Sequence, residues 1–323
     1  MLRKLFLVFG VAISFFLFSI DGLTERYSYA GVIKTLSYDK LDYDIYDIEF
    51  VDSNYGWAGS RGGLIFKTED GGKTWGIVDP GVGVNIFGLS FVNEKRGWAV
   101  GRGGVILTTS DGGDNWVRQK SPLPNHLFQV AFSDELHGVA IGDWGKIILT
   151  EDGGSNWIDV SLKEDIMLYD LCFIDEKDGW IAGERGFMFH TIDGGRNWET
   201  MDLGEGRTFF GVAFDRQGNG IAVGLEGSMC LTSDGGKTWE FKLNVAKVPL
   251  FNVVLSNGKG IATGDMATLL ETKDAGRTWN LIDAPLRRKH IWLQGAESLG
   301  EDKYIIGGAM GSIMFIEDSQ FKY

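Results

Sequence analysis

Short apolar runs alternate with polar turns along most of the chain, and the fourth copy of this pattern shows it most clearly. Residues 169–174 alternate between apolar and polar side chains, residues 175–179 are polar, and residues 180–183 are apolar again. A three-residue turn precedes a third run over residues 187–191, and a polar, glycine-containing box leads into a fourth run at residues 198–203. Alternation with a period of two predicts β-strands. Four antiparallel strands in about forty residues are typical of a propeller blade.

The polar box recurs as the pattern Asp-Gly/Ala-Gly-x-x-Trp, and its copies are spaced by 41, 41, 41, 41 and 40 residues. The Asp and Trp pairs of the six copies are Asp70 and Trp75, Asp111 and Trp116, Asp152 and Trp157, Asp193 and Trp198, Asp234 and Trp239, and Asp274 and Trp279. An aromatic residue opens the first run of each copy: Tyr46, Phe87, Phe128, Tyr169, Phe210 and Phe251. A constant period of this size indicates a repeat architecture.

A seventh copy follows, in which the box is no longer recognisable. Trp292 opens its first run, and residues 304–307 and 311–316 form its second and third runs. Asp318 and Tyr323 stand in the places of the box Asp and Trp. The chain ends there, so the seventh copy has no fourth strand of its own.

Residues 33–37, upstream of the first copy, stand where a fourth strand would stand, with Lys34 in the position of the box Trp. We predict that this N-terminal strand completes the last blade and closes the ring, because closure removes open sheet edges. The expected fold is therefore all-β: one seven-bladed β-propeller with Asp-box turns over residues 30–323, without a second domain.

The first 22 residues are typical of an export signal. Arg3 and Lys4 precede an uncharged apolar run over residues 5–20, which matches the charged and hydrophobic regions of a secretory signal peptide. Cleavage after Gly22 fits this pattern, and the small residues at 28 and 30 form a later site. An uncleaved anchor, with membrane association, is the alternative. Both interpretations predict an extracytoplasmic protein, in a periplasm or lumen or secreted.

Composition narrows the partners and the chemistry. The formal net charge of −13 argues against a nucleic-acid partner, because no basic stripe is available to replace counterions. Cys172 and Cys230 lie in apolar strand-like runs, so we expect buried free thiols and no disulfide framework. Neither cysteine has a His or Cys at metal-ligand spacing. We expect no metal, no cofactor and a monomer.

Each box lies in the turn between the third and fourth runs. Its Asp can accept hydrogen bonds from its own turn, its glycines allow left-handed dihedrals, and its Trp offers apolar surface to the neighbouring blade. A calcium loop is the functional alternative. However, each turn supplies one dependable carboxylate, whereas Ca²⁺ takes about six to eight oxygen ligands. We predict that the boxes are structural.

The boxes resemble the Asp boxes, or BNR repeats, of sialidases, sortilin-type receptors, xyloglucanases and the photosystem II stability/assembly factor family. The whole repeat pairs Gly-Trp-Ala-x-Gly-x-x-Gly-x-Ile, clearest in residues 91–106, with Thr-x-Asp-Gly-Gly-x-x-Trp. In this pairing it most resembles the assembly-factor family, over about residues 30–323. The chain lacks the Arg-Ile/Leu-Pro motif of sialidases, and it has room for one propeller where such xyloglucanases carry two.

The resemblance implies a non-enzymatic, chaperone-like propeller of an extracytoplasmic compartment, which binds a polypeptide or membrane-protein segment. Photosynthetic members of the family are expected to carry an arginine-rich patch. That patch is only partly matched in this sequence.

The copies differ most in two turns that a propeller places on the face opposite the boxes. In the turn between the second and third runs, the first position holds Arg61, Arg102, Asp143, Glu184, Leu225, Asp265 and Ala309, and the second holds Gly62, Gly103, Trp144, Arg185, Glu226, Met266 and Met310. Two residues before the opening aromatic stand Asp44, Asn85, His126, Met167, Thr208, Pro249 and His290. We expect a binding face there, with the candidate residues Arg61, Arg102, His126, Trp144, Arg185, Arg207, Arg287, Arg288 and His290.

Charges on this face should separate into two sectors. Arg61, Arg102, Arg287, Arg288 and Lys289 would form a basic sector, and Asp143, Glu184, Glu226 and Asp265 an acidic sector across from it. An ordinary solvated surface of mixed charge is the alternative. The opening aromatics also have two interpretations: they line the mouth of a central channel for binding or, as we expect, wedge the inner strands together at the axis.

Two function classes remain open. His126 and His290 are candidate acid–base groups, but neither has a visible nucleophile beside it. Glycosidase chemistry needs two carboxylates facing each other across a sugar, and Asp143 with Glu184 or Glu226 could supply them. The hypotheses are an exported, non-enzymatic propeller that binds a polypeptide, which we favour, and a glycan-active enzyme of sialidase-like or other Asp-box glycosidase type.

Overall fold

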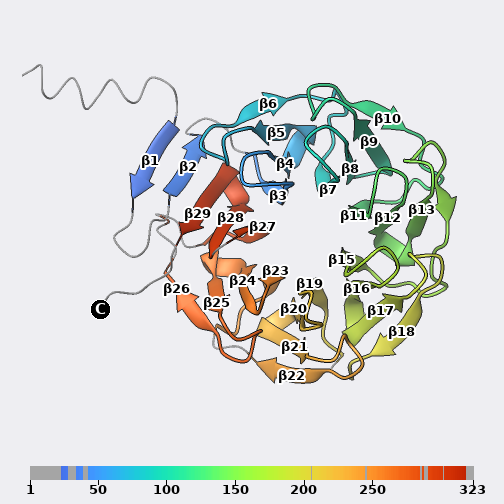
Figure 1. Ribbon diagram of the computed structural model, residues 1–323, viewed down its shortest axis with the longest axis vertical. Helices are drawn as coiled ribbons and strands as arrows, with labels where there is room; N and C mark the ends of the chain where they lie inside the picture. Colours follow the sequence, from blue (N-terminus) through green and yellow to red (C-terminus); the bar gives the residue numbers. More distant parts are fainter. Residues whose placement is uncertain are drawn as a thin grey trace, which may run out of the picture.

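The computed structural model describes residues 23–27, 34–38, 43–204, 206–243, 246–283, 286, 290–300 and 302–317. Within these residues the chain forms strands β1 to β29, which are gathered into seven sheets. The sheets stand side by side around one axis in the order of the sequence (Figure 1). The predicted all-β, seven-bladed propeller is confirmed.

Six blades each contain four antiparallel strands that follow one another from the axis outward. In blade 4 the third strand has the predicted bounds, and the other three start within one residue of the predicted positions. The strands of blades 1 to 3 are β3 (Ile45–Phe50), β4 (Gly56–Ser60), β5 (Ile65–Thr68), β6 (Gly76–Val78); β7 (Ile86–Phe91), β8 (Gly97–Gly101), β9 (Val105–Thr109), β10 (Val117–Gln119); β11 (Leu127–Phe132), β12 (Gly138–Gly142), β13 (Ile147–Thr150) and β14 (Ile158–Asp159). Those of blades 4 to 6 are β15 (Leu168–Phe173), β16 (Gly179–Gly183), β17 (Phe187–Thr191), β18 (Glu199–Asp202); β19 (Phe209–Phe214), β20 (Gly220–Gly224), β21 (Ser228–Thr232), β22 (Glu240–Leu243); β23 (Leu250–Ser256), β24 (Lys259–Gly264), β25 (Leu269–Thr272) and β26 (Asn280–Ile282).

The seventh blade is built differently. Its own strands are β27 (Leu293–Gly300), β28 (Lys303–Gly308) and β29 (Ser312–Glu317). β29 pairs with β2 (Lys34–Tyr38), and β2 pairs with β1 (Leu23–Tyr27), a strand that the sequence analysis did not predict. In Figure 1, β1 and β2 lie at the outer side of this blade.

Several predictions at the two ends of the chain fall outside the described residues. The proposed signal at residues 1–22 lies there, as do Asp318 and Tyr323 and the segments 28–33 and 39–42 that flank β2. Closure of the ring by an N-terminal strand therefore stays a prediction, and so does the export signal.

Every inner strand carries a β-bulge, and in six blades the extra residue is the opening aromatic. In blade 1, Ile45 pairs with Ser60 and Asp47 pairs with Gly59, which leaves Tyr46 without a partner in the ladder. The same shift occurs in each later blade. A bulge of this kind bends the strand and redirects the extra side chain.

The strand register of blade 7 differs from the predicted one. Its bulge lies between Leu293 and Gly295, so Gln294 occupies the position that is aromatic in the other blades. The prediction that Trp292 opens the strand was wrong by two residues. Trp292 misled the sequence analysis because an aromatic residue two places early satisfied the same pattern.

The same shift affects His290. The carbonyl of Trp292 accepts the N–H of Ala309 at 3.0 Å, as the carbonyl of Asp44 accepts the N–H of Arg61 at 2.9 Å. Trp292, and not His290, is therefore the turn residue of blade 7 that corresponds to Asp44. The prediction that placed His290 in this set was wrong.

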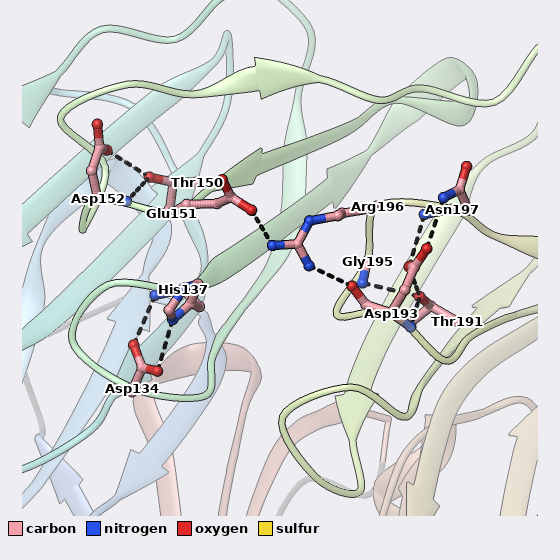
Figure 2. A network of polar contacts seen from close by, with 10 residues as sticks. All are labelled: Asp134, His137, Thr150, Glu151, Asp152, Thr191, Asp193, Gly195, Arg196 and Asn197. Atoms are coloured by element: carbon pink, nitrogen blue, oxygen red, sulfur yellow. Dashed lines mark hydrogen bonds and ion pairs between the residues drawn. The ribbon is translucent and has the colours of Figure 1, made fainter.

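Each Asp box is closed by the same hydrogen bonds within its own turn. In blade 4 the Thr191 hydroxyl donates to Asp193 Oδ1 at 2.9 Å and accepts the Gly195 N–H at 3.0 Å. Asp193 also accepts the backbone N–H and the side-chain amide of Asn197, at 3.0 and 2.7 Å (Figure 2). The other five boxes repeat these bonds, with Asn or Thr in the last position. Each carboxylate is thus engaged by its own turn, and hydrogen bonds from Thr238 lower the pKa of Asp234 to about 2.

Large side chains join neighbouring blades. Trp57 of β4 stacks on Phe91 of blade 2, with ring centroids 3.5 Å apart, and donates its indole N–H to the Gly112 carbonyl at 2.9 Å. Trp98 of β8 makes the equivalent contacts with blade 3. The hydrophobic core consequently lies between the sheets, in clusters that each combine residues of two adjacent blades.

We expect the substitution Asp193→Ala to lower the free energy of unfolding by about 1–3 kcal/mol, because the Thr191 hydroxyl and the Asn197 donors lose their acceptor. Urea denaturation followed by circular dichroism measures this. As a control, Asp165→Ala removes an exposed carboxylate outside the boxes and should change the value by less than about 0.5 kcal/mol. Equal stability of the Asp193→Ala and wild-type proteins would contradict a structural role for the box.

Candidate binding face opposite the boxes

The turns of the propeller fall on two faces. On the box face, a box N–H donates to the turn between the first two strands, as Gly71 does to the Asn54 carbonyl. On the opposite face, the turn between the second and third strands donates to the turn that enters the blade, as Arg61 does to the Asp44 carbonyl. We call this second face the variable face. Its turns are η2 (Arg61–Gly63), residues 102–104, η3 (Asp143–Gly145), η4 (Glu184–Gly186), η5 (Leu225–Gly227), η6 (Asp265–Ala267) and η7 (Ala309–Gly311).

The second residue of every variable turn has a left-handed backbone. Gly62 and Gly103 fill this position in blades 1 and 2, with φ of 80° and 72°. The other five blades use non-glycine residues with φ between 56° and 61°, namely Trp144, Arg185, Glu226, Met266 and Met310. This conformation costs an L-amino acid roughly 1–2 kcal/mol. The local backbone therefore does not explain the choice of these residues.

Several of these turns expose large apolar side chains. Trp144 is 55% exposed, Met266 50%, Met310 44%, and the neighbouring Leu225 40%. Strained backbone positions often occur at functional sites, and exposed apolar side chains gathered on one face mark interaction surfaces. With about half of their surface exposed, these side chains contribute only in part to the packing of the propeller.

Closer to the axis, the bulged aromatics contact one another around the ring. Ring centroids of neighbouring blades lie between 4.9 and 6.2 Å apart along the series Tyr46, Phe87, Phe128, Tyr169, Phe210 and Phe251. Gln294 has no aromatic ring, and Trp292 instead stacks on Tyr46, with ring centroids 5.7 Å apart. These rings are half-buried, so they wedge the inner strands together and keep part of their surface open.

The predicted basic sector is assembled only in part within the described residues. Arg61 Nη1 lies 3.5 Å from Asp44 Oδ2, while Arg102 is exposed and has no ion-pair partner in the described part of the chain. His290 is exposed. Residues 287–289, which would complete the sector, lie outside the described residues.

His126 and Asp143 lie together at blade 3. Asp143 Oδ2 is 3.8 Å from His126 Nδ1, and the same nitrogen accepts the Gly103 N–H at 3.4 Å. Asp143 is 8% exposed, and its other oxygen has no hydrogen-bond partner in the described part of the chain. Asp143 directly precedes the exposed Trp144 in the sequence.

The remaining acidic residues bind their own neighbours. Glu184 accepts the N–H of Met167 at 3.2 Å, and burial together with the charge of Glu184 raises the pKa of Tyr169 to about 12. Glu226 pairs with Arg207. The predicted acidic sector is thus a set of local contacts that includes a predicted binding arginine.

Arg185 belongs to the same region and not to the basic sector. Its guanidinium donates to the Asp165 carbonyl at 3.5 Å. The candidate glycosidase carboxylates Asp143, Glu184 and Glu226 each face a neighbour from the turn beside them. The structure shows no two of them in contact with each other.

A polar layer just inside the aromatics was missed by the sequence analysis. Asp47 accepts the Leu89 N–H of blade 2, and Asp170 accepts the Val212 N–H of blade 5, both at 2.8 Å. Gln129 of blade 3 lowers the pKa of both carboxyl groups, against the effect of burial. These residues directly follow three of the opening aromatics, so the repeat shows their position in each blade. The repeat does not show that they meet near the axis.

The carboxyl groups near the axis are crowded. Burial raises the pKa of Asp47 to about 7, and the charge of Asp170 acts in the same direction. Burial also raises the pKa of Glu297 to about 8, with a contribution from Asp47. Burial and the charge of Glu297 raise the pKa of Glu49. These groups consequently favour their neutral forms at moderately acidic pH.

Other chemistry is limited in the described part of the chain. No group of three or more His, Cys, Asp or Glu side chains there is arranged to hold a metal ion, and none of its helices has the length and apolar character to cross a membrane. Cys172 is half-buried and Cys230 is buried, and both are free thiols.

A closed series of blades, with Asp-box turns on one face and divergent turns on the other, defines an Asp-box propeller. The model of the photosynthesis system II assembly factor YCF48 family matches residues 33–121, 119–207 and 198–296. These matches cover most of the sequence. The chain belongs to this family, as the repeats indicated.

Solved structures share the fold. YCF48 bound to a D1 peptide is 19% identical with a TM-score of 0.74, over 91% of this chain and 99% of that chain. YCF48 from Cyanidioschyzon merolae is 20% identical with a TM-score of 0.71, over 87% and 98% of the two chains. An ancestral GH74 enzyme is 12% identical with a TM-score of 0.64, over 90% of this chain and 46% of that chain. No curated protein sequence matches the chain.

The crowded carboxyls predict the pH dependence of stability. In the unfolded chain these groups lose their protons near their ordinary pKa values of 3.8 and 4.5, whereas in the folded protein Asp47 and Glu297 do so at about 7 and about 8. Between these limits the folded state binds more protons, so raising the pH removes stability. We expect the free energy of unfolding to fall between about pH 5 and about pH 8.

The substitution Glu297→Gln tests the origin of this slope. Glutamine keeps the acceptor that binds the Ser298 N–H at 2.8 Å but cannot ionise. We expect a shallower slope, and a variant more stable than the wild type near the upper end of the range. Glu176→Gln, at an exposed site, should leave the slope unchanged. Parallel curves for Glu297→Gln and the wild type in urea titrations would refute the assignment.

Proposed function

We propose that the protein is an exported, non-enzymatic propeller whose variable face binds a polypeptide or a membrane-protein segment, as an assembly factor does. The observation that carries this proposal is the set of large side chains held in left-handed turn positions and exposed on one face. Membership of the YCF48 family supports a role in assembly. A YCF48 of the same fold has been solved with a D1 peptide bound.

The chemistry of the face suits a polypeptide. Trp144, Met266 and Met310 offer apolar surface, and aromatic residues and Met are enriched where proteins bind one another. Methionine side chains adapt to partners of varied shape. Arg102, exposed at blade 2, adds a positive charge for an acidic group of the partner. The net charge of −13 disfavours nucleic acid.

An extracytoplasmic location completes the proposal. The charged start and apolar run of residues 3–20 support export, either with cleavage or with retention as an anchor. A membrane-protein segment that emerges from the same membrane would be presented on that side. The proposed partner and the proposed location are therefore mutually consistent.

The triple variant Trp144→Gly, Met266→Gly and Met310→Gly separates binding from folding. Relief of left-handed strain, roughly 1–2 kcal/mol per residue, offsets the greater freedom of glycine in the unfolded chain, about 0.5–1 kcal/mol. We expect an unfolding free energy no lower than that of the wild type. Peptide binding should weaken at least about tenfold, since three apolar anchors are lost.

Fluorescence anisotropy measures this, with synthetic peptides that cover termini and loops of membrane proteins, a D1 peptide among them. The matched control removes three equally exposed apolar side chains from the outer strands: Ile77→Gly, Ile158→Gly and Leu281→Gly. The control should bind like the wild type although it is less stable. A variable-face triple variant with unchanged affinity, or a wild type that binds none of the peptides, would reject the proposal.

The glycosidase alternative predicts a different result. A screen against sialosides and β-glucans should show no turnover if the protein only binds. Turnover that disappears in Asp143→Ala and Glu184→Ala variants would overturn the non-enzymatic proposal. Turnover that persists in both variants would do so as well, and would place the chemistry elsewhere.

A further inference from the structure

A cavity of about 200 Å³ opens on the box face between blades 3 and 4. Val139, Leu149 and Phe173 form its apolar part, and Gly194 of the blade 4 box lines it. Its edge is charged: Arg196 reaches across to Glu151, and His137 Nδ1 lies 2.8 Å from Asp134 (Figure 2). The cavity lies on the face opposite the proposed polypeptide site, so it requires a separate account.

The internal repeats show what is missing there. Val139 is the second residue of β12. The corresponding residue is a tryptophan in blades 1, 2 and 4 and an isoleucine in blades 5 to 7. In blade 1 that residue, Trp57, fills the gap to the next blade by stacking on Phe91 and donating to the Gly112 carbonyl. Blade 2 does the same through Trp98.

The partners of the missing indole are still present between blades 3 and 4. Phe173 corresponds to Phe91 at the end of the inner strand, and Gly194 corresponds to Gly112 as the first glycine of the box. A Cβ built on the next residue, Gly195, would lie 2.6 Å from Val139 Cγ2, which places this box directly against the shortened side chain. No described side chain donates to the Gly194 carbonyl. The cavity thus contains an aromatic ring and a hydrogen-bond acceptor that an indole could use, as Trp57 does in blade 1.

The size of the space agrees with this interpretation. An enclosed apolar cavity of about 150 Å³ accepts a benzene ring. The present cavity is open on one side and polar at its edge, and its volume of about 200 Å³ is large enough for a fused two-ring system. All 11 tryptophans of the chain lie among the described residues, and none of them lines this cavity. An indole that fills this cavity would therefore come from another molecule.

We propose that this cavity binds the indole side chain of a tryptophan in a polypeptide partner. The ring stacks on Phe173 and its N–H donates to the Gly194 carbonyl, as Trp57 does for the neighbouring blades. The charged edge formed by Arg196, Glu151 and Lys177 contacts the polar backbone on either side of the tryptophan. This site is independent of the variable face, so either proposal can fail without the other.

Blade 4 shows that the tryptophan alone is not sufficient. Trp180 occupies the same position in β16 and stacks on Phe214 of blade 5, with ring centroids 5.5 Å apart. Its ring also stacks on His190 at 4.1 Å, and its N–H has no hydrogen-bond partner among the described residues. Between blades 3 and 4 the counterpart of His190 is Leu149, which pairs with Val139 and lines the cavity with an aliphatic side chain.

The test uses the full protein and N-acetyl-tryptophanamide as the probe, measured by isothermal titration calorimetry. Val139→Trp fills the cavity with the side chain that blades 1 and 2 carry. We expect this variant to bind the probe at least tenfold more weakly than the wild type. Val117→Trp makes the same exchange at an exposed site of β10 and should bind like the wild type. Equal binding by the wild type and Val139→Trp, or no saturable binding by the wild type, overturns the proposal.

Two further probes keep the test decisive if Val139→Trp does not fold. The 1-methylindole analogue of the probe cannot donate a hydrogen bond, and we expect it to bind wild-type protein about fivefold to tenfold more weakly. Equal affinity for the two analogues would reject the Gly194 contact. Free indole should bind more weakly than a tryptophan-containing tripeptide, and tighter binding of free indole would reject a polypeptide partner.

Discussion

The hydrogen bonds that a box carboxylate accepts within its own turn support much of the propeller. They hold the third and fourth strands of a blade together, and the box glycine N–H ties the same turn to the connection between the first two strands, as Gly112 does with the Lys95 carbonyl. In blades 2 and 3 the carbonyl of this glycine also accepts the indole N–H of the tryptophan of the preceding blade. One eight-residue motif therefore organises a blade internally and, where the tryptophan is present, joins it to the next.

This concentration of constraints on one face leaves the other face free. On the variable face each turn is fixed by a hydrogen bond from the N–H of its first residue to a carbonyl of the turn that enters the blade, and some turns add further backbone bonds. The side chain of the second turn residue is exposed in blades 3, 6 and 7, and in blades 4 and 5 it contacts a neighbouring turn. None of these side chains takes part in a contact that all blades repeat. The repeats diverge there for this reason, and charged, aromatic and sulfur-containing side chains occupy equivalent positions in successive blades. Sameness between copies consequently marks structural positions, and difference marks positions that the fold leaves free to vary.

The sequence predicted the period, the blade count and most strand ends, because alternation and the box are local signals. It failed in blade 7, where Trp292 two residues early imitated the opening aromatic and displaced His290 in the comparison. It also assigned Arg185 and Arg207 to a general binding surface without foreseeing their contacts with Asp165 and Glu226. Those contacts depend on which turns meet in space. The valine at position 139 was visible as a break in the Trp57 and Trp98 series, but only the stacking on Phe91 and the Gly112 acceptor gave that break a chemical meaning.

The left-handed residues of the variable face lower the stability of the folded state. Five residues in left-handed conformations at roughly 1 kcal/mol each sum to about 5 kcal/mol, whereas a whole domain is typically stable by about 5–15 kcal/mol. Blades 1 and 2 show that glycine serves the same turn without this strain, since Gly62 and Gly103 adopt the same backbone. If stability alone determined the residue, glycine would be expected in every blade. Instead Trp144, Met266 and Met310 hold exposed apolar surface at these positions, which is the choice that the proposed polypeptide site predicts.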